Sequence, residues 1–312
     1  MMRAPTAVLP GVPMCNALTI DVEDYFQVSA LAPYIPRSEW DTLGGRVESN
    51  VDRILALLDE YGARATFFTL GWIAERYPGL IHRIVANGHE LASHGFAHKR
   101  ASEQSPAAFF SDIQLAKIVL EDLAGVEVTG YRAPSFSIGH ANLWAFECIE
   151  RAGYRYSSSV YPIRHDHYGM PDAPRFAYKV REGLLEVPLT TMHLFGRNWP
   201  AAGGGYFRLV PYAMSRWLLS RVNQVDRQPA IFYFHPWEID PEQPRVPGID
   251  ARTRFRHYLN LDRTERRLRR LLFDFEWGRV DEVLVDASPT EVVAWRLDPE
   301  AAAVSPELHA AQ

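Results

Sequence analysis

The stretch Asn16–Phe26, NALTIDVEDYF, decides the fold, because it is a strand-like run that ends in three acidic residues. Residues 17–22 are apolar or β-branched except for Asp21, which is typical of a strand inside a sheet. Asp21, Glu23 and Asp24 then fall within four positions. Carboxylates this close repel one another unless one is protonated or a cation lies among them. The rest of the chain must therefore supply positive charge.

Strand and helix signals alternate about seven times after this stretch, with no clear linker between them. Residues 47–61 have apolar side chains at helical spacing, Gly62 suits the helix end, and residues 65–70 form a short apolar strand. The segment 195–208, FGRNWPAAGGGYFR, has the composition of a flexible glycine-rich loop. The alternation predicts one α/β domain with a mostly parallel sheet, open or closed into a barrel. Polar residues at the carboxyl ends of such strands line the functional site.

Composition excludes several classes of protein. The chain has 312 residues, 47% hydrophobic and 23% charged, which fits a soluble globular protein. A net charge of −5 gives no reason to expect a nucleic-acid partner, and the basic run near residue 266 fits a solvated helix face better than a polyanion site. Two cysteines make no disulfide framework, and no apolar stretch suggests a signal peptide or membrane helix. A cytoplasmic location is expected.

Three further predicted strand ends carry chemically capable residues: His94 and His98, Arg132, and His235. Two imidazoles spaced by four residues together with a carboxylate are a metal-ligand set. An isolated pair of this kind is more often structural, but the acid cluster favours a metal, because a divalent cation would relieve the repulsion among the acids. The sequence therefore predicts a metal site at these strand ends.

The three acids need not share one role. In a strand, Asp21 and Glu23 lie on one face and Asp24 on the other, although a turn at the strand end could bring Asp24 round. One acid can bind the metal while another takes a proton from water. Arg132 could pair with the free carboxylate and keep it ionised.

His235 follows the apolar run IFYF and precedes Pro236, where it has no obvious structural task. A histidine that does not bind metal could protonate a leaving group. Glu186, Glu238 and Asp240 are candidates to orient it, and the sequence does not choose among them.

The order of these motifs resembles the polysaccharide deacetylases of carbohydrate esterase family 4, from about residue 17 to residue 235. That family begins with Thr-Phe-Asp-Asp, where the first Asp is the catalytic base and the second binds metal. The resemblance implies Asp21 as base and Asp24 as metal ligand, with Glu23 as the alternative ligand, because Val22 stands where the second Asp is expected. The implied fold is a distorted (β/α) barrel with fewer than eight regular strands.

The later motifs complete the implied site. HGFAH gives His94 and His98 as metal ligands, RAPSF gives Arg132, and YFH gives His235 as the general acid. The family's fourth motif carries an Asp that YSSSVY lacks, so the partner of His235 stays open. The implied cofactor is a divalent metal, with Zn²⁺ expected. Aromatic residues beside the motifs are candidate sugar contacts: Tyr131, Phe136, Tyr206 and Trp237.

Longer matches such as DVEDYFQV and YFHPWEID are similar to the deacetylases of exosortase and exopolysaccharide loci. That resemblance implies N-deacetylation of a polysaccharide or its lipid-linked precursor, at the inner face of the membrane and beside the exopolysaccharide machinery. The sequence further predicts a domain organisation: an irregular leader at 1–15, a catalytic domain at 16–296 with a C-terminal helical extension, and a flexible tail at 297–312. The alternatives are hydrolysis of small amides or acetyl esters, or non-catalytic glycan binding.

Overall fold

The computed structural model describes residues 14–165, 168–286 and 293–294. The predicted leader and tail fall almost entirely outside these ranges. The strands are β1 (Cys15–Val22), β2 (Thr66–Thr69), β3 (Glu90–Ser93), β4 (Gly130–Tyr131), β5 (Tyr156–Ser157), β6 (Tyr178–Arg181), β7 (Leu184–Glu186), β8 (Thr191–Leu194), β9 (Arg197–Pro200), β10 (Ile231–Phe234), β11 (Glu276–Gly278) and β12 (Val293–Ala294). The α-helices are α1 (Val47–Glu60), α2 (Gly71–Arg76), α3 (Pro78–Ala86), α4 (Pro106–Ala124), α5 (Ala145–Arg151), α6 (Gly204–Leu209), α7 (Tyr212–Arg221), α8 (Ala251–Tyr258) and α9 (Leu261–Asp274).

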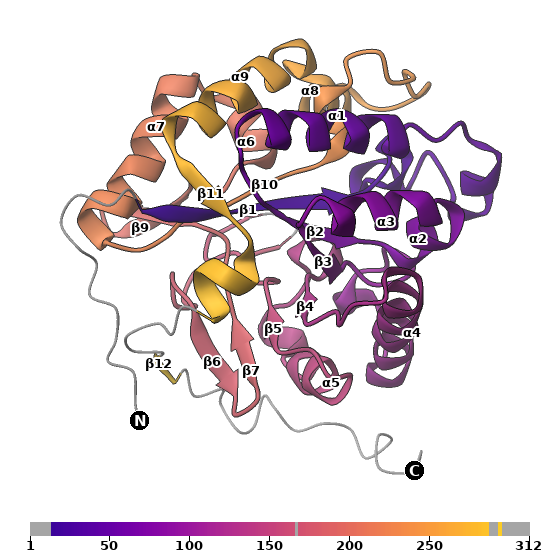
Figure 1. Cartoon of the computed structure of the whole chain (residues 1–312), viewed down its shortest axis with the longest axis horizontal. Helices are drawn as coiled ribbons and strands as arrows, with labels where there is room; N and C mark the ends of the chain where they lie inside the picture. The colour runs from indigo at the N-terminus through magenta and orange to yellow at the C-terminus, as the bar shows by residue number, and fades with distance from the viewer. Residues whose placement is uncertain (1–13, 166–167, 287–292, 295–312) are drawn as a thin grey trace.

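The main sheet has the order β10-β1-β2-β3-β4-β5-β7-β6-β12, with β11 also paired to β1. In the described part of the chain, seven neighbouring strands from β10 to β7 run parallel. Figure 1 shows β1 crossing the middle of the molecule with α1 and α9 on one side of it. The arrangement confirms the predicted α/β class and its distorted barrel with fewer than eight regular strands.

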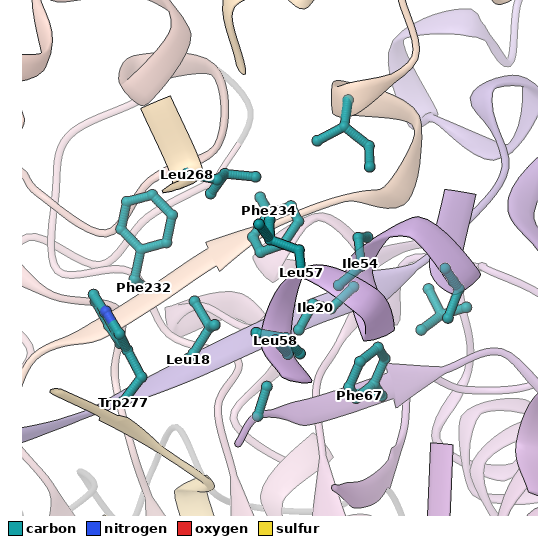
Figure 2. Packing of buried hydrophobic residues seen from close by; sticks show 14 of the residues in the cluster. Leu18, Ile20, Ile54, Leu57, Leu58, Phe67, Phe232, Phe234, Leu268 and Trp277 are labelled. Carbon is teal, nitrogen blue, oxygen red and sulfur yellow. The ribbon is translucent and has the colours of Figure 1, made fainter. Parts of the chain in front are cut away.

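The alternation of side chains along β1 divides the core into two layers. Leu18 and Ile20 point outward and pack with α1 and α9, as Figure 2 shows, whereas Ala17 lies in a separate interior cluster with Phe68 and Tyr233. Each fully buried Leu, Ile or Phe contributes about 1.5–3 kcal/mol to folding. A shift of β1 by one residue would exchange the two faces, so the register that buries Leu18 and Ile20 also fixes Asp21 toward the interior.

The segment 195–208 differs from the predicted loop, because it contains all of strand β9 and most of helix α6. β8 and β9 pair antiparallel, and α6 begins inside the glycine run. Gly203 has a φ of 112°, and a Cβ added there would lie 2.2 Å from the carbonyl oxygen of Tyr233. Glycine is therefore needed for close approach to β10, not for flexibility.

The amino end of the barrel holds a buried carboxyl group. Glu90 at the start of β3 accepts a hydrogen bond from the Tyr156 hydroxyl (2.8 Å) and one from the backbone N–H of Asp281 (3.2 Å). Burial and the nearby charge of Asp281 raise its pKa from 4.5 to about 8. Glu90 thus makes a pH-sensitive contribution to stability at the end of the barrel opposite the carboxyl ends of the strands.

We expect the free energy of unfolding to fall as pH rises from 4.5 to 8, because only the folded state keeps Glu90 protonated across that window. The stabilisation is complete below pH 4.5 and lost above the folded pKa. Glu90→Gln should remove on the order of 3 kcal/mol of this pH dependence. Urea titrations of both proteins between pH 5 and 8 measure it, and parallel stability curves would refute the assignment.

No helix in the described ranges combines the length and apolarity that crossing a bilayer requires.

Candidate active site

Asp21 lies at the carboxyl end of β1 and faces the barrel interior. Its Oδ1 accepts a hydrogen bond from Nη1 of Arg132 at 2.6 Å. The same Nη1 donates to the Thr19 hydroxyl (2.8 Å), which itself donates to the backbone carbonyl of Phe232 (3.0 Å). These contacts hold one carboxylate oxygen of Asp21 and leave Oδ2 directed toward His235, 4.0 Å away.

Arg132 is fully buried, so its charge needs a partner inside the protein. Besides Asp21, its guanidinium donates to the backbone carbonyl of Ser158 (3.1 Å) and to the Ser158 hydroxyl (2.9 Å). Its central carbon also lies 4.0 Å from the ring centre of Phe68, a cation–π contact. The structure thus brings Arg132 to Asp21 as the sequence predicts. Ser158, from the segment YSSSVY, accepts hydrogen bonds that hold the guanidinium of Arg132 in place.

Glu23, His94 and His98 form one buried cluster. Glu23 Oε1 lies 3.1 Å from Nε2 of His94 and 2.9 Å from Nε2 of His98. The three ligand atoms all lie within 4.8 Å of one another. Although burial alone would raise the pKa of Glu23, the charges of His98 and His235 hold that pKa well below its ordinary value. The cluster therefore presents an ionised carboxylate between two imidazole nitrogens.

The tautomer of His94 makes this cluster suited to a cation. Nδ1 of His94 lies 2.8 Å from the backbone carbonyl of Arg132, and a carbonyl can only accept. Nδ1 therefore carries a proton, which leaves Nε2, the ring nitrogen that faces Glu23, as the nitrogen able to bind a cation. A backbone carbonyl behind the second ring nitrogen is also the usual support of a metal-bound histidine.

Asp24 does not join the histidines, so the preferred sequence assignment is corrected here. Its Oδ1 accepts from the backbone N–H of Tyr25 (2.8 Å), and its Oδ2 accepts from those of Arg46 (2.5 Å) and Val47 (2.9 Å). Asp24 thus caps a short 3₁₀ helix (Tyr25–Gln27) and the start of α1. The alternative named from the sequence, Glu23, occupies the position beside His94 and His98.

His235 follows β10 and is oriented by Glu238. Nδ1 of His235 donates to Oε1 of Glu238 at 2.7 Å, and Oε2 of Glu238 accepts from Nε of Arg208 at 2.6 Å. Burial alone would lower the pKa of His235, but the carboxylates of Glu23 and Glu238 outweigh it and raise that pKa to about 9. Burial would likewise raise the pKa of Glu238, but Arg208 and His235 lower it to about 2.

The other two candidates for orienting His235 have different partners. Glu186 accepts hydrogen bonds from the backbone N–H groups of Ser159 and Val160, both at 2.8 Å, and Asp240 forms an ion pair with Arg46. Sequence reasoning missed Arg208, because it lies in the glycine-rich segment with no motif around it. The signal for Glu238 was available: it follows His235 by three residues across Pro236, the spacing of a capped helical turn.

The predicted sugar contacts divide into three groups. Tyr131 is 1% exposed and packs against Phe109 and Tyr154 on the outer face of the sheet, so its assignment to substrate is wrong. Phe136 and Trp237 border the site but are buried, and Trp237 stacks on His235 with ring centres 5.2 Å apart. Tyr206 is half-buried and lines an apolar cavity beside β9.

The structure is thus a mostly parallel distorted barrel with ionisable residues at its strand ends. Residues 40–157 match the family described as polysaccharide deacetylase, which confirms for that region the family expected from the sequence. Residues 158–285 match a domain of unknown function, DUF3473. The two regions share one sheet, and Asp21 and Glu23 precede both.

Curated relatives and a solved structure are similar to this chain. A peptidoglycan-N-acetylglucosamine deacetylase of Bacillus cereus is 33% identical over 33% of this chain and 46% of its own length. A peptidoglycan deacetylase-like protein of Gibberella zeae is 31% identical over 37% of this chain and 33% of its own length. The alignments thus span less than half of either curated relative. The crystal structure of a candidate polysaccharide deacetylase from Mycobacterium smegmatis matches 95% of this chain and 98% of its own, with a TM-score of 0.60 and 20% identity, and shares the fold.

Proposed function

We propose that this protein hydrolyses N-acetyl groups of amino sugars in a polysaccharide or its lipid-linked precursor, with the help of a divalent metal. The observation that carries the proposal is the placement of Glu23, His94 and His98 directly beside Asp21 and His235. Nε2 of His235 lies 3.8 Å from Glu23 Oε1 and 4.0 Å from Asp21 Oδ2. A metal-ligand set, a base and an acid thus meet in one place, and the deacetylase names of the relatives support the reaction class.

The donor set fits a metal. One carboxylate oxygen and two imidazole nitrogens are ligands that Zn²⁺ takes in catalytic sites, where further positions stay open. Glu23, His94 and His98 would hold the ion, and the backbone carbonyl of Arg132 would keep His94 in the required tautomer. A bound Zn²⁺ supplies Lewis-acid chemistry, polarising a carbonyl and acidifying a water molecule.

The protein's own residues then move the protons. Asp21, held in place by its ion pair with Arg132, accepts a proton from the water that attacks the acetyl carbon. His235, whose Nδ1–H is held by Glu238, delivers a proton from Nε2 to the departing amine nitrogen. The carbon–nitrogen bond breaks, a carbon–oxygen bond forms, and the products are acetate and a free amino sugar.

An acetate-release screen tests the reaction class. The purified protein, stripped and reloaded with Zn²⁺, is assayed on N-acetylglucosamine oligomers, on O-acetylated xylo-oligosaccharides and on small acetamides. We expect release from the N-acetylated oligomers to exceed the other two by at least about tenfold, the scale of modest specificity. Preference for the small amides or the esters would overturn the N-deacetylase assignment.

We further propose a role in bacterial exopolysaccharide biosynthesis at the inner face of the membrane, in company with the polymer-building machinery. Motifs such as DVEDYFQV and YFHPWEID support it through their similarity to deacetylases of those loci. Deletion of the gene should leave the secreted polymer over-acetylated, measured as acetyl groups per amino sugar.

A further inference from the structure

The β8–β9 hairpin carries an exposed aromatic residue at its tip. Phe195 and Gly196 form the turn with φ angles of 53° and 72°, the left-handed pair that suits a tight two-residue hairpin. Phe195 is 87% exposed although phenylalanine is costly both in water and at positive φ. Its place at the tip, in a conformation that glycine or asparagine would adopt more easily, indicates a contact outside the chain.

The hairpin and α7 enclose an apolar cavity of about 430 Å³. In Figure 1, β9 and α7 lie on the same side of the molecule. The hairpin contributes Phe195 and Trp199 to the lining, and the helix contributes Met214 and Trp217. All four of these side chains are also exposed to solvent. We call these four residues the apolar rim.

Helix α7 is apolar on two sides, and packing against the core accounts for only one of them. Leu219 packs into the main core with α1 and α9. Met214 and Trp217, at positions i and i+3, are exposed apolar residues on another side of the helix, and the charged Arg221 at i+7 continues the same stripe. An exposed apolar stripe beside an exposed apolar hairpin marks an interaction surface.

Charge identifies what this surface contacts. Residues 191–228 contain five arginines and one aspartate, a net charge of +4 within a chain of −5. Two of the arginines are paired, Arg208 with Glu238 and Arg216 with Asp274. The aspartate, Asp226, is itself paired with Arg175.

The remaining arginines face solvent, and two of them lie on the elements that carry the apolar rim, Arg197 on β9 and Arg221 on α7. Within the described ranges, Arg197, Arg221 and Arg227 have no carboxylate at ion-pair distance, and all three are exposed. Arg197 lies over the ring of Trp199, 4.3 Å from its centre. Arginine and tryptophan side by side, with an apolar tip beyond them, is the pattern of side chains that sit at a lipid headgroup boundary.

We propose that the apolar rim and these arginines dock the protein on the surface of an anionic lipid bilayer. Phe195 inserts among the acyl chains, while Arg197, Arg221 and Arg227 contact lipid phosphates. A second copy of the chain is a poorer occupant, because two surfaces that each carry exposed, unpaired arginines would repel each other. A neutral glycan would draw no benefit from three unpaired arginines. The proposal is independent of the hydrolytic reaction.

Vesicle flotation with the full chain tests this docking. Wild type should float with vesicles of phosphatidylglycerol and phosphatidylethanolamine but not of phosphatidylcholine alone, and should detach as salt is raised. Phe195→Glu should lower the partition coefficient by about tenfold or more, because a charge at the tip opposes insertion. Phe273→Glu is the matched control, since Phe273 on α9 is 81% exposed but lies outside the rim, and should bind as wild type.

A double change, Arg197→Gln with Arg221→Gln, should weaken partitioning roughly tenfold at low salt and flatten its salt dependence. Brominated lipids should quench tryptophan fluorescence of wild type and not of Phe195→Glu.

Failure of wild type to bind anionic vesicles, or equal binding by the two phenylalanine variants, would overturn the proposal. So would a wild-type dimer that Phe195→Glu converts to monomer in sedimentation equilibrium, because the surface would then belong to a second copy. Acetate release from a soluble oligomer is measured alongside. Absence of acetate release would contradict the proposed hydrolysis and would leave the membrane-docking proposal unaffected.

Discussion

Replacing Glu23 with Gln should abolish metal binding and turnover together. The carboxylate oxygen of Glu23 lies within 3.1 Å of both Nε2 atoms of His94 and His98, so it is the anionic member of the cluster. A neutral amide removes that charge and leaves two imidazoles, which we expect to bind the metal more than about 100-fold more weakly, since even supporting residues behind the ligands are worth 10–100-fold. Metal content after dialysis and acetate release from N-acetylglucosamine oligomers measure both effects.

Asp24→Asn is the matched control, one residue away and equally buried. Its amide nitrogen cannot accept the hydrogen bonds that Oδ2 takes from the N–H groups of Arg46 and Val47. Two buried donors lose their acceptor, so the free energy of unfolding should fall by about 1–3 kcal/mol while the metal stays bound. The opposite outcome, with metal lost from Asp24→Asn and kept by Glu23→Gln, would make Asp24 the metal ligand in place of Glu23.

Much of the fold could be predicted from the sequence, because its elements are locally determined. The run Ala17–Val22 became most of β1, and the helix at 47–61 became α1. The pieces of the site could also be grouped in advance, since the carboxyl ends of parallel strands meet at one edge. Asp21, Arg132 and His235 come together for this reason, although more than 100 residues separate the first two.

Two features could not be predicted, because distant residues decide them. Strand alternation alone places Glu23 on the same face as Asp21, whereas the family motif favours Asp24 as the metal ligand. What settles the matter is the start of α1 at Val47, whose free N–H groups need the carboxylate of Asp24. The segment 195–208 has the composition of a loop. Its glycine at 203 is needed because a Cβ there would collide with the backbone carbonyl of Tyr233, and the β8–β9 hairpin precedes it in the chain.

Replacing Asp21 with Asn should leave the metal bound and lower turnover by about 10²–10⁴-fold, the usual contribution of a general base. Asparagine keeps an oxygen for Nη1 of Arg132 but cannot take a proton from water. The variant also leaves the charge of the fully buried Arg132 without its nearest counter-charge. Stability should therefore fall by about 3 kcal/mol, within the range for breaking a buried ion pair.

Because instability could imitate lost chemistry, the assay must separate the two. Turnover and metal content of Asp21→Asn are measured well below its own unfolding midpoint, alongside Ser158→Ala. Ser158→Ala removes the 2.9 Å hydrogen bond to Nη2 of Arg132 but leaves the carboxyl group of Asp21 beside Arg132. The free energy of unfolding of Ser158→Ala should fall by about 1 kcal/mol, the typical net contribution of one hydrogen bond. Its turnover should fall by less than about tenfold. If Ser158→Ala loses as much turnover as Asp21→Asn, the position of Arg132 limits the reaction. If Asp21→Asn stays active, another group must take the proton, and Glu23, whose Oε1 lies 3.8 Å from Nε2 of His235, is the candidate.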